Sequence, residues 1–167
     1  MIDLHLSDQL LAPLWRDSFS SVGFCRLVNH SLDGTALSEK SAQFFRLSEK
    51  EKAKASAMSY GLNGFSAVGK EAVGREKADP VESLVFNRGG HDASDVPKEL
   101  CDEAWKYYEH SEALVRRLMR ITAISLNWNE DFFDESFKEP SCALRIANYK
   151  PSLVENGEFL YAEHTGF

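Results

Sequence analysis

The chain has 167 residues, of which 43% are hydrophobic and 27% are charged. This is the composition of an ordinary globular protein, and the length is enough for one domain with a buried core. The formal net charge of −7 arises from acids interleaved with bases, which argues against the concentrated basic face that a nucleic-acid-binding protein needs.

The sequence carries no sign of a membrane or secretory segment. No apolar stretch approaches the ~20 residues of a membrane-spanning helix, and residues 1–5 lack the basic and apolar regions of a secretory signal. The three cysteines are far apart, and their odd number suits neither a zinc site nor a disulfide framework. We therefore expect a cytoplasmic protein with no membrane or nucleic-acid partner.

The first part of the chain alternates helical and strand patterns. A helix is expected over residues 7–20, starting near Pro13, because proline is best tolerated in a first turn. Residues 24–28 follow as a strand and residues 35–46 as a second helix. The residues at helical spacing are Leu10, Leu11, Leu14, Ser18 and Phe19 in the first helix. In the second helix the inward residues are Leu37, Ser41, Phe44 and Phe45.

Residues 48–92 contain a helix-capping pattern, a glycine-rich stretch, and a strand followed by a turn. Ser48 and Glu51 form the pattern of a capping box, in which the serine accepts from a backbone N–H and the glutamate reaches back. The glycine-rich residues 60–74 indicate a loop or an irregular hairpin. Residues 81–86 are expected to form a strand and residues 89–92 a turn.

The strongest pattern predicts one long helix over residues 98–126. At 1.5 Å per residue this helix would be roughly 40 Å long. A coiled coil is the competing interpretation, but the stripe contains alanine, serine and tyrosine, which favour packing on a sheet or another helix. The stripe consists of Leu100, Ala104, Tyr107, Ser111, Leu114, Leu118, Ile121 and Ser125.

The pattern then changes from helical to β. Residues 144–149 and 158–164 are strand-like and are separated by a turn. Side chains alternate faces along a strand, so His164 shares a face with Leu160 and Ala162. A histidine in such a position is, taken alone, more often structural than a metal ligand. The fold class is therefore α+β: helices and strands, a long spine helix, and the opening strands of an all-β unit.

A series of short motifs, in matching order over nearly the whole chain, resembles the isopenicillin N synthase-like non-haem iron(II)/2-oxoglutarate-dependent oxygenases. The motifs are residues 23–30 (GFCRLVNH), 44–47 (FFRL), 77–83 (KADPVES), 144–151 (LRIANYKP) and 163–165 (EHT). The resemblance implies that the all-β unit is a double-stranded β-helix, or jelly roll.

The resemblance also implies a site. The family holds Fe(II) with two histidines and one carboxylate, which leaves positions for 2-oxoglutarate and oxygen. His164 matches the first metal ligand, and Asn148 and Tyr149 match positions near the co-substrate pocket, although Lys150 replaces the family's second tyrosine. The alternative interpretation is that Asn148 and Tyr149 are ordinary strand residues whose hydrogen bonds are satisfied within the protein.

The rest of the metal site is missing from the sequence. Gly166 stands where the family has its aspartate, and no residues remain for the distal histidine or for the arginine that pairs with 2-oxoglutarate. Glu163 would point to the opposite face of a regular strand from His164. The final Gly166-Phe167 fits a short deletion as well as a natural stop.

We therefore expect two regions: residues 1–97 as a dioxygenase N-terminal-like region, and residues 98–167 as the long helix and the start of an incomplete jelly-roll catalytic domain. The chain resembles a fragment of an oxygenase that oxidises a small organic molecule, and is expected to be inactive alone because its metal triad is incomplete. The alternative is a non-catalytic interaction or oligomerisation module. Whether the chain is an enzyme stays open, and self-association through the incomplete C-terminal sheet is expected.

Overall fold

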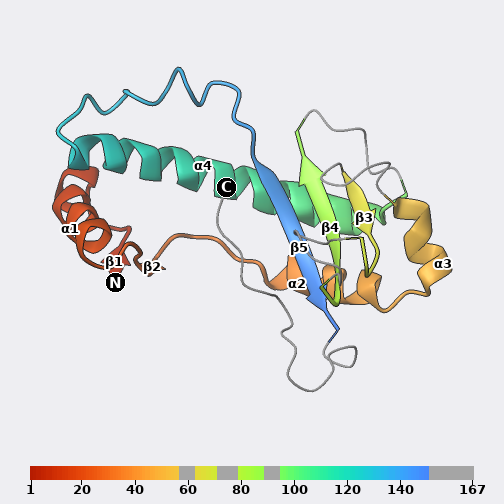
Figure 1. Cartoon of the computed structure of the whole chain (residues 1–167). Coiled ribbons are helices and arrows are strands. Elements are labelled where there is room, and N and C mark those ends of the chain that lie inside the picture. The colour runs from red at the N-terminus through yellow and green to blue at the C-terminus, as the bar shows by residue number, and fades with distance from the viewer. Residues whose placement is uncertain (57–62, 71–78, 89–94, 151–167) are drawn as a thin grey trace. The chain divides into compact units, whose positions relative to one another are not determined.

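A computed structural model describes most of the chain: residues 1–56, 63–70, 79–88 and 95–150 (Figure 1). These residues form two compact units, which are described separately. The first contains Met1–Asp33 and Tyr107–Ser141, and the second contains Gly34–Lys106 and Cys142–Phe167. The division into regions 1–97 and 98–167 stays a prediction.

The first unit packs a short parallel strand pair and helix α1 (Asp8–Ser21) against the later part of helix α4 (Lys98–Ser125). Strands β1 (Ile2–Asp3) and β2 (Leu27–Val28) form the pair. The core of this unit is a cluster of residues that are at most 3% exposed: Ile2, Leu4, Leu11 and Ile121. Partly buried residues packed against it are Trp15, Cys25, Leu27, Leu114 and Leu118.

Helix α1 departs from the prediction in its start and its buried face. It begins at Asp8, so the expectation that it starts near Pro13 is wrong. Proline leaves the carbonyl four residues earlier without a helical partner, and here that carbonyl belongs to the exposed Gln9, where water can reach it. The buried residues are Leu11 and Ala12. Of the other residues expected at helical spacing, Ser18 is half-buried and three are exposed: Leu10, Leu14 and Phe19.

The strand expected over residues 24–28 is shorter than predicted. It is reduced to β2, and Phe24 is 71% exposed. A strand extends only as far as a partner offers backbone groups, and β1 has two residues. The bonds that flank the pair run from the Ile2 N–H to the Arg26 carbonyl and from the Leu4 N–H to the Val28 carbonyl.

The second unit opens with two helices whose predictions are confirmed. Helix α2 spans Thr35–Phe45, and the inward residues expected on it are all buried. The Ser48 side chain then accepts from the Glu51 N–H, while the Glu51 carboxylate accepts from the Ser48 N–H at 3.0 Å. This capping box starts the short helix α3 (Glu49–Lys52), which a 3-10 turn (Ala53–Ala55) follows.

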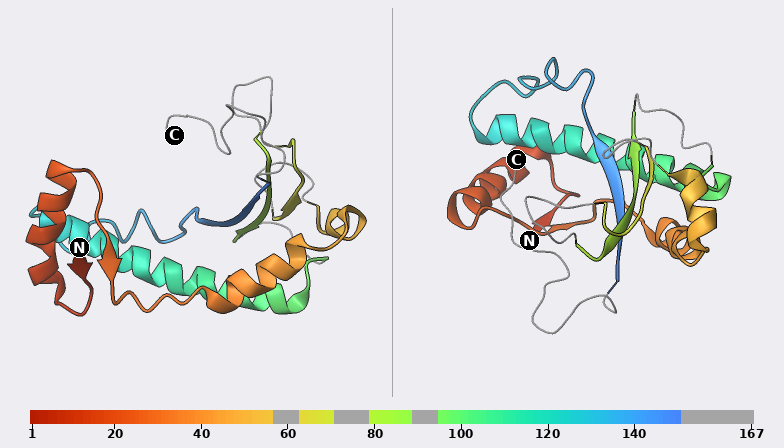
Figure 2. Two further views of the ribbon diagram at one scale, coloured as in Figure 1. Left: turned by 90° about the horizontal axis from the view of Figure 1, so that it is seen from below. Right: turned by 45° about the vertical axis from the view of Figure 1, so that its right-hand side comes forward.

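Three antiparallel strands complete the second unit in the order β3-β4-β5. They are β3 (Gly64–Ser66), β4 (Val81–Asn87) and β5 (Ala143–Tyr149), so the strands expected over 81–86 and 144–149 are confirmed. Helix α2 and the first turns of α4 lie beside the sheet (Figure 2). Ring pairs at 5.8 Å join these helices to the sheet, namely Phe44–Phe65 and Phe86–Trp105.

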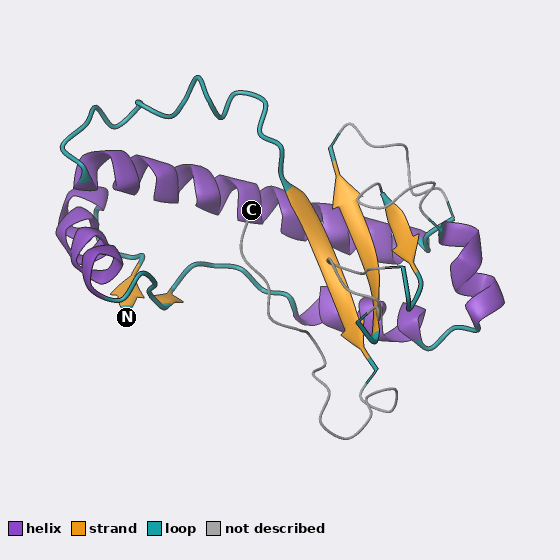
Figure 3. Cartoon of the chain, in the orientation of Figure 1, coloured by secondary structure: helices purple, strands orange, loops and turns teal. Residues whose placement is uncertain are grey.

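Helix α4 confirms the long helix expected over residues 98–126 (Figure 3). Half of the predicted stripe is buried, namely Leu100, Ala104, Ile121 and Ser125, and the other four residues of the stripe are half-buried. Tyr108 and Ala123 are buried although the stripe did not include them. No helix in the described part of the chain is long and apolar enough to span a membrane. The predicted turn at 89–92, the strand at 158–164 and parts of the 60–74 loop lie outside the described residues.

Candidate functional site: a buried ion cluster on the central strand

Strand β4 carries a glutamate where an apolar residue is expected. Residues 81–86 are all buried, and Glu82 has an exposed fraction of 0%. Strands buried on both faces are usually continuous apolar runs. An unpaired carboxylate in such a place costs several kcal/mol, so Glu82 must have partners.

Glu82 uses both carboxylate oxygens. Its Oε2 accepts from Lys52 Nζ at 2.6 Å. Its Oε1 accepts from Lys150 Nζ at 2.6 Å and from Asn148 Nδ2 at 2.8 Å. Asn148 lies directly opposite Glu82 in the β4–β5 register, and Lys150 follows β5. Helix α3, strand β4 and the end of β5 therefore each contribute to one ion cluster.

Lys52 is the second buried charge, with a side chain 1% exposed. Besides Glu82 it contacts Glu49 Oε1 at 2.6 Å, and its Nζ lies 5.3 Å from the centroid of the Phe65 ring. The ring face is negative and attracts the ammonium. The capping box at Ser48 fixes where helix α3 begins and thereby places Lys52 over the sheet.

The cluster stays ionised. Burial acts to raise the pKa of the Glu82 carboxyl, but the hydrogen bonds from Lys150, Lys52 and Asn148 outweigh it and hold the pKa below its usual range. Burial acts to lower the pKa of Lys52, but its bonds to Glu49 and Glu82 outweigh that effect and hold the pKa above its usual range. Near neutral pH the site is therefore a buried carboxylate between two ammonium groups.

The structure brings one of the three predicted site residues into this cluster. Asn148 donates to Glu82, whereas Tyr149 is opposite Val81 in the register and, by strand alternation, projects to the other face from Asn148. His164 lies outside the described residues. A co-substrate role for Asn148 and Tyr149 and a metal role for His164 stay predictions.

The chemistry of the donors suits a carboxylate ligand. A lysine ammonium has three N–H donors, and Lys150 uses one of them on Glu82 while its side chain is 28% exposed. The described residues contain no group of three or more His, Cys, Asp or Glu that could hold a metal ion. They therefore fit the anionic end of a co-substrate and do not fit an iron site by themselves.

Sequence reasoning missed Glu82 and Lys52 as members of the site. The available signal was a lone glutamate in the otherwise uncharged run of residues 81–86, because such a residue is rarely buried unless it is paired. Its partners were not readable, since Lys52 and Asn148 are 30 and 66 residues away along the chain.

Comparison with known proteins places these features in a family. Residues 1–107 match the sequence model of the family described as non-haem dioxygenase in morphine synthesis N-terminal. This match covers more than half of the chain. The chain belongs to this family. The expected resemblance to iron(II)/2-oxoglutarate-dependent oxygenases is thereby confirmed.

Solved structures share the fold. A full-length Neurospora crassa protein, crystallised in complex with alpha-KG, is 21% identical, with a TM-score of 0.79 over 99% of this chain and 60% of that one. The Arabidopsis thaliana dioxygenase for auxin oxidation, in a binary complex with 2-oxoglutarate, is 22% identical, with a TM-score of 0.70 over 99% and 63%.

A 2OG-Fe(II) oxygenase family protein from Caulobacter crescentus is also similar, at 22% identity, with a TM-score of 0.73 over 90% of this chain and 55% of that one. The chain thus spans 55–63% of the length of these three structures. At these identities the likeness concerns the fold alone. A search of curated proteins found no match.

Proposed function

We propose that the chain forms part of an iron(II)- and 2-oxoglutarate-dependent oxygenase that oxidises a small organic molecule. The observation that carries this proposal is the family match over residues 1–107, and the shared fold with proteins crystallised with 2-oxoglutarate supports it. In this proposal strand β5, within residues 98–167, belongs to the jelly-roll catalytic domain, and strand β4, within residues 1–97, pairs with it.

The described residues would contribute to co-substrate binding and not to the chemistry at the metal. Iron, when bound in this family, supplies oxygen activation. In this chain Asn148 and Lys150 would bind a carboxylate of 2-oxoglutarate, with Glu82 fixing the position of both donors. Because Glu82 is buried and bonded to both side chains, it would hold the donors of Asn148 and Lys150 in one geometry.

The 167 residues alone are proposed to be inactive. His164 is the one residue of the sequence at a metal-ligand position of the family, and Gly166 offers no side chain at the next position. We expect weak iron(II) binding and no conversion of 2-oxoglutarate to succinate, as measured by calorimetry and by succinate detection. Stoichiometric iron binding at about micromolar Kd that His164→Ala abolishes would overturn this proposal.

A second candidate function is a non-catalytic module that associates with itself. The observation that favours it is the position of β5, which lies at the edge of the described sheet and pairs with β4 alone among the described strands. The edge of a sheet can take a strand from another chain. Self-association would place a second copy of the chain beside β5.

Light scattering tests the second function directly. We expect the mean mass to rise with concentration, and hydrogen exchange of the backbone amides of residues 143–149 to slow in parallel, since association covers that edge. A constant monomer mass, with amide exchange independent of concentration, would exclude self-association. The oxygenase proposal would then be the one that remains.

A further inference from the structure

The segment that follows helix α4 in the first unit exposes a group of aromatic side chains. Trp128 and Phe132 have exposed fractions of 46% and 55%, and their ring centroids lie 4.4 Å apart. The half-buried Phe133 ring packs on both, at 5.9 Å from Trp128 and 5.0 Å from Phe132. Scattered exposed apolar residues need no explanation, whereas a contiguous exposed group marks an interaction surface. These three residues are called the aromatic cluster below.

The start of this segment is fixed to the end of α4. The Trp128 N–H donates to the Ala123 carbonyl at 3.0 Å, and Asn127 between them has a φ angle of 59°. A left-handed residue followed by such a bond is a common way to end a helix. Arg16 of α1 also donates to Asn127 Oδ1 at 3.1 Å. The position of Trp128 is therefore set by the helix end and by α1.

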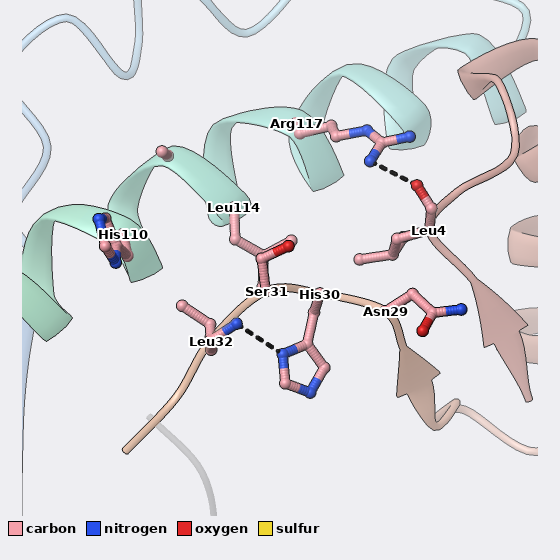
Figure 4. A pocket seen from close by; sticks show the side chains of 9 residues that line it. Leu4, Asn29, His30, Ser31, Leu32, His110, Leu114 and Arg117 are labelled. Carbon is pink, nitrogen blue, oxygen red and sulfur yellow. Dashed lines mark hydrogen bonds between the residues drawn. The ribbon is translucent and has the colours of Figure 1, made fainter. Parts of the chain in front are cut away.

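The far end of the segment is held by Arg116. Its Nη1 donates to the Phe137 carbonyl at 2.7 Å, while its Nη2 donates to Glu112 Oε1 at 2.8 Å. Arg117, the next residue of α4, donates instead to the Leu4 carbonyl at 2.8 Å (Figure 4). Successive residues of an α-helix point about 100° apart, so the two arginines hold different segments against the helix. The segment with the aromatic cluster is thus attached to α4 at both ends.

The same segment is strongly acidic. Residues 128–135 contain no basic residue and four acids, all of them exposed: Glu130, Asp131, Asp134 and Glu135. Among the described residues, the one ion pair found for these acids joins Glu135 to Lys138 at 3.9 Å. Each acid is at most two residues along the chain from a member of the aromatic cluster. The rings therefore lie in a negative field, which salt screens only over about 8 Å.

This charge decides which partner suits the surface. A negative field repels nucleic acids and anionic membranes. A second copy of the chain has a formal net charge of −7, with its bases interleaved with acids, so it offers no concentrated basic surface. Arginine side chains combine the two properties required, because a guanidinium stacks on an aromatic face and also pairs with carboxylates.

We propose that residues 128–135 bind an arginine-rich segment of a partner protein, whose guanidinium groups stack on Trp128 and Phe132. The four acids attract the segment through their summed field, so the acids need not all face the rings. The surface is separate from the buried ion cluster at Glu82. Failure of this proposal would therefore leave the oxygenase proposal unchanged.

The test uses the full 167-residue chain and a capped hexa-arginine peptide as the probe. A titration followed by amide NMR at low salt should give saturable shifts confined to residues 126–139. Hexa-lysine carries the same charge but stacks less well on aromatic rings, so it should bind about fivefold more weakly. Hexa-glutamate should not bind. Phe132→Leu keeps an apolar side chain but removes the ring, and should narrow the difference between hexa-arginine and hexa-lysine.

Two double variants separate the local field from the net charge of the chain. Asp131→Asn with Asp134→Asn should weaken hexa-arginine binding about fivefold or more. The matched control, Asp17→Asn with Glu39→Gln, removes two negative charges at exposed positions outside the segment, and should change the affinity less than about twofold. All four positions are exposed, so neither variant should affect folding.

Three results would overturn the proposal. The first is no saturable shift up to about 5 mM hexa-arginine, and the second is an equal loss of affinity in the two double variants. The third is a shift of residues 126–139 that depends on protein concentration without any peptide, which would assign the surface to a second copy of the chain.

Discussion

Glu82→Gln should lower the free energy of unfolding by about 3–5 kcal/mol, because it removes one partner of a buried ion cluster. Lys52, 1% exposed, would keep only Glu49, and Lys150 would lose its carboxylate. The glutamine amide would also direct N–H donors toward one of the ammonium groups, which themselves have no acceptor. Urea unfolding followed by circular dichroism gives the difference.

Glu49→Gln is the matched control, since Glu49 contacts the same Lys52 Nζ at the same 2.6 Å but has a side chain 75% exposed. Exposed pairs contribute about 0–1 kcal/mol, so this variant should be close to the parent protein. Equal losses in the two variants would contradict the assignment of the cluster to Glu82.

The pH dependence provides an independent check of the same cluster. The folded pKa of Glu82 is depressed, so its contribution is present above the unfolded value of about 4.3 and is lost as the pH falls through the folded value. The folded pKa of Lys52 is raised, so its contribution is complete below about 10.4 and is lost as the pH rises through the folded value. Glu82→Gln should flatten the acid part of this profile, and an unchanged acid slope would argue against the depressed pKa.

Elements with a strong internal pattern could be predicted from the sequence. Helices α2 and α4 follow their apolar spacing, and the capping box before α3 lies within four residues. The strands β4 and β5 could be predicted from their own composition, since β4 contains Val81, Val85 and Phe86 and β5 contains Ile146 and Tyr149, which are strand-forming residues. In these cases the decisive interactions are local or depend only on the element's own periodicity.

Features that depend on a distant partner could not be predicted. The spacing in α1 allowed Leu10 or Leu11 to face inward, and only the cluster with Ile2 and Ile121 selects Leu11. The length of β2 depends on β1, which has two residues. The ion cluster likewise joins residues from α3, β4 and the end of β5, so sequence spacing carries no trace of it.

Ile121→Asp should have the second large effect, on the first unit. Ile121 is fully buried with Ile2, Leu4 and Leu11, so the substitution would place a carboxylate among apolar side chains without a partner. A loss of about 4 kcal/mol or more in the free energy of unfolding is expected, at the upper end of the range for single substitutions. Ile121→Ala, which leaves only a cavity, should cost about 2–5 kcal/mol.

Two other positions on α4 test whether the loss of stability caused by an aspartate increases with the burial of the residue it replaces. Leu118 is only partly buried against that cluster, so Leu118→Asp should destabilise less than Ile121→Asp. Val115 is 38% exposed, and Val115→Asp should change the free energy of unfolding by less than about 1 kcal/mol. Urea midpoints in the order Val115→Asp, Leu118→Asp, Ile121→Asp, from highest to lowest, are expected. A midpoint for Ile121→Asp equal to that of Val115→Asp would remove this face of α4 from the core, because an aspartate is tolerated only where water or a cation can reach it.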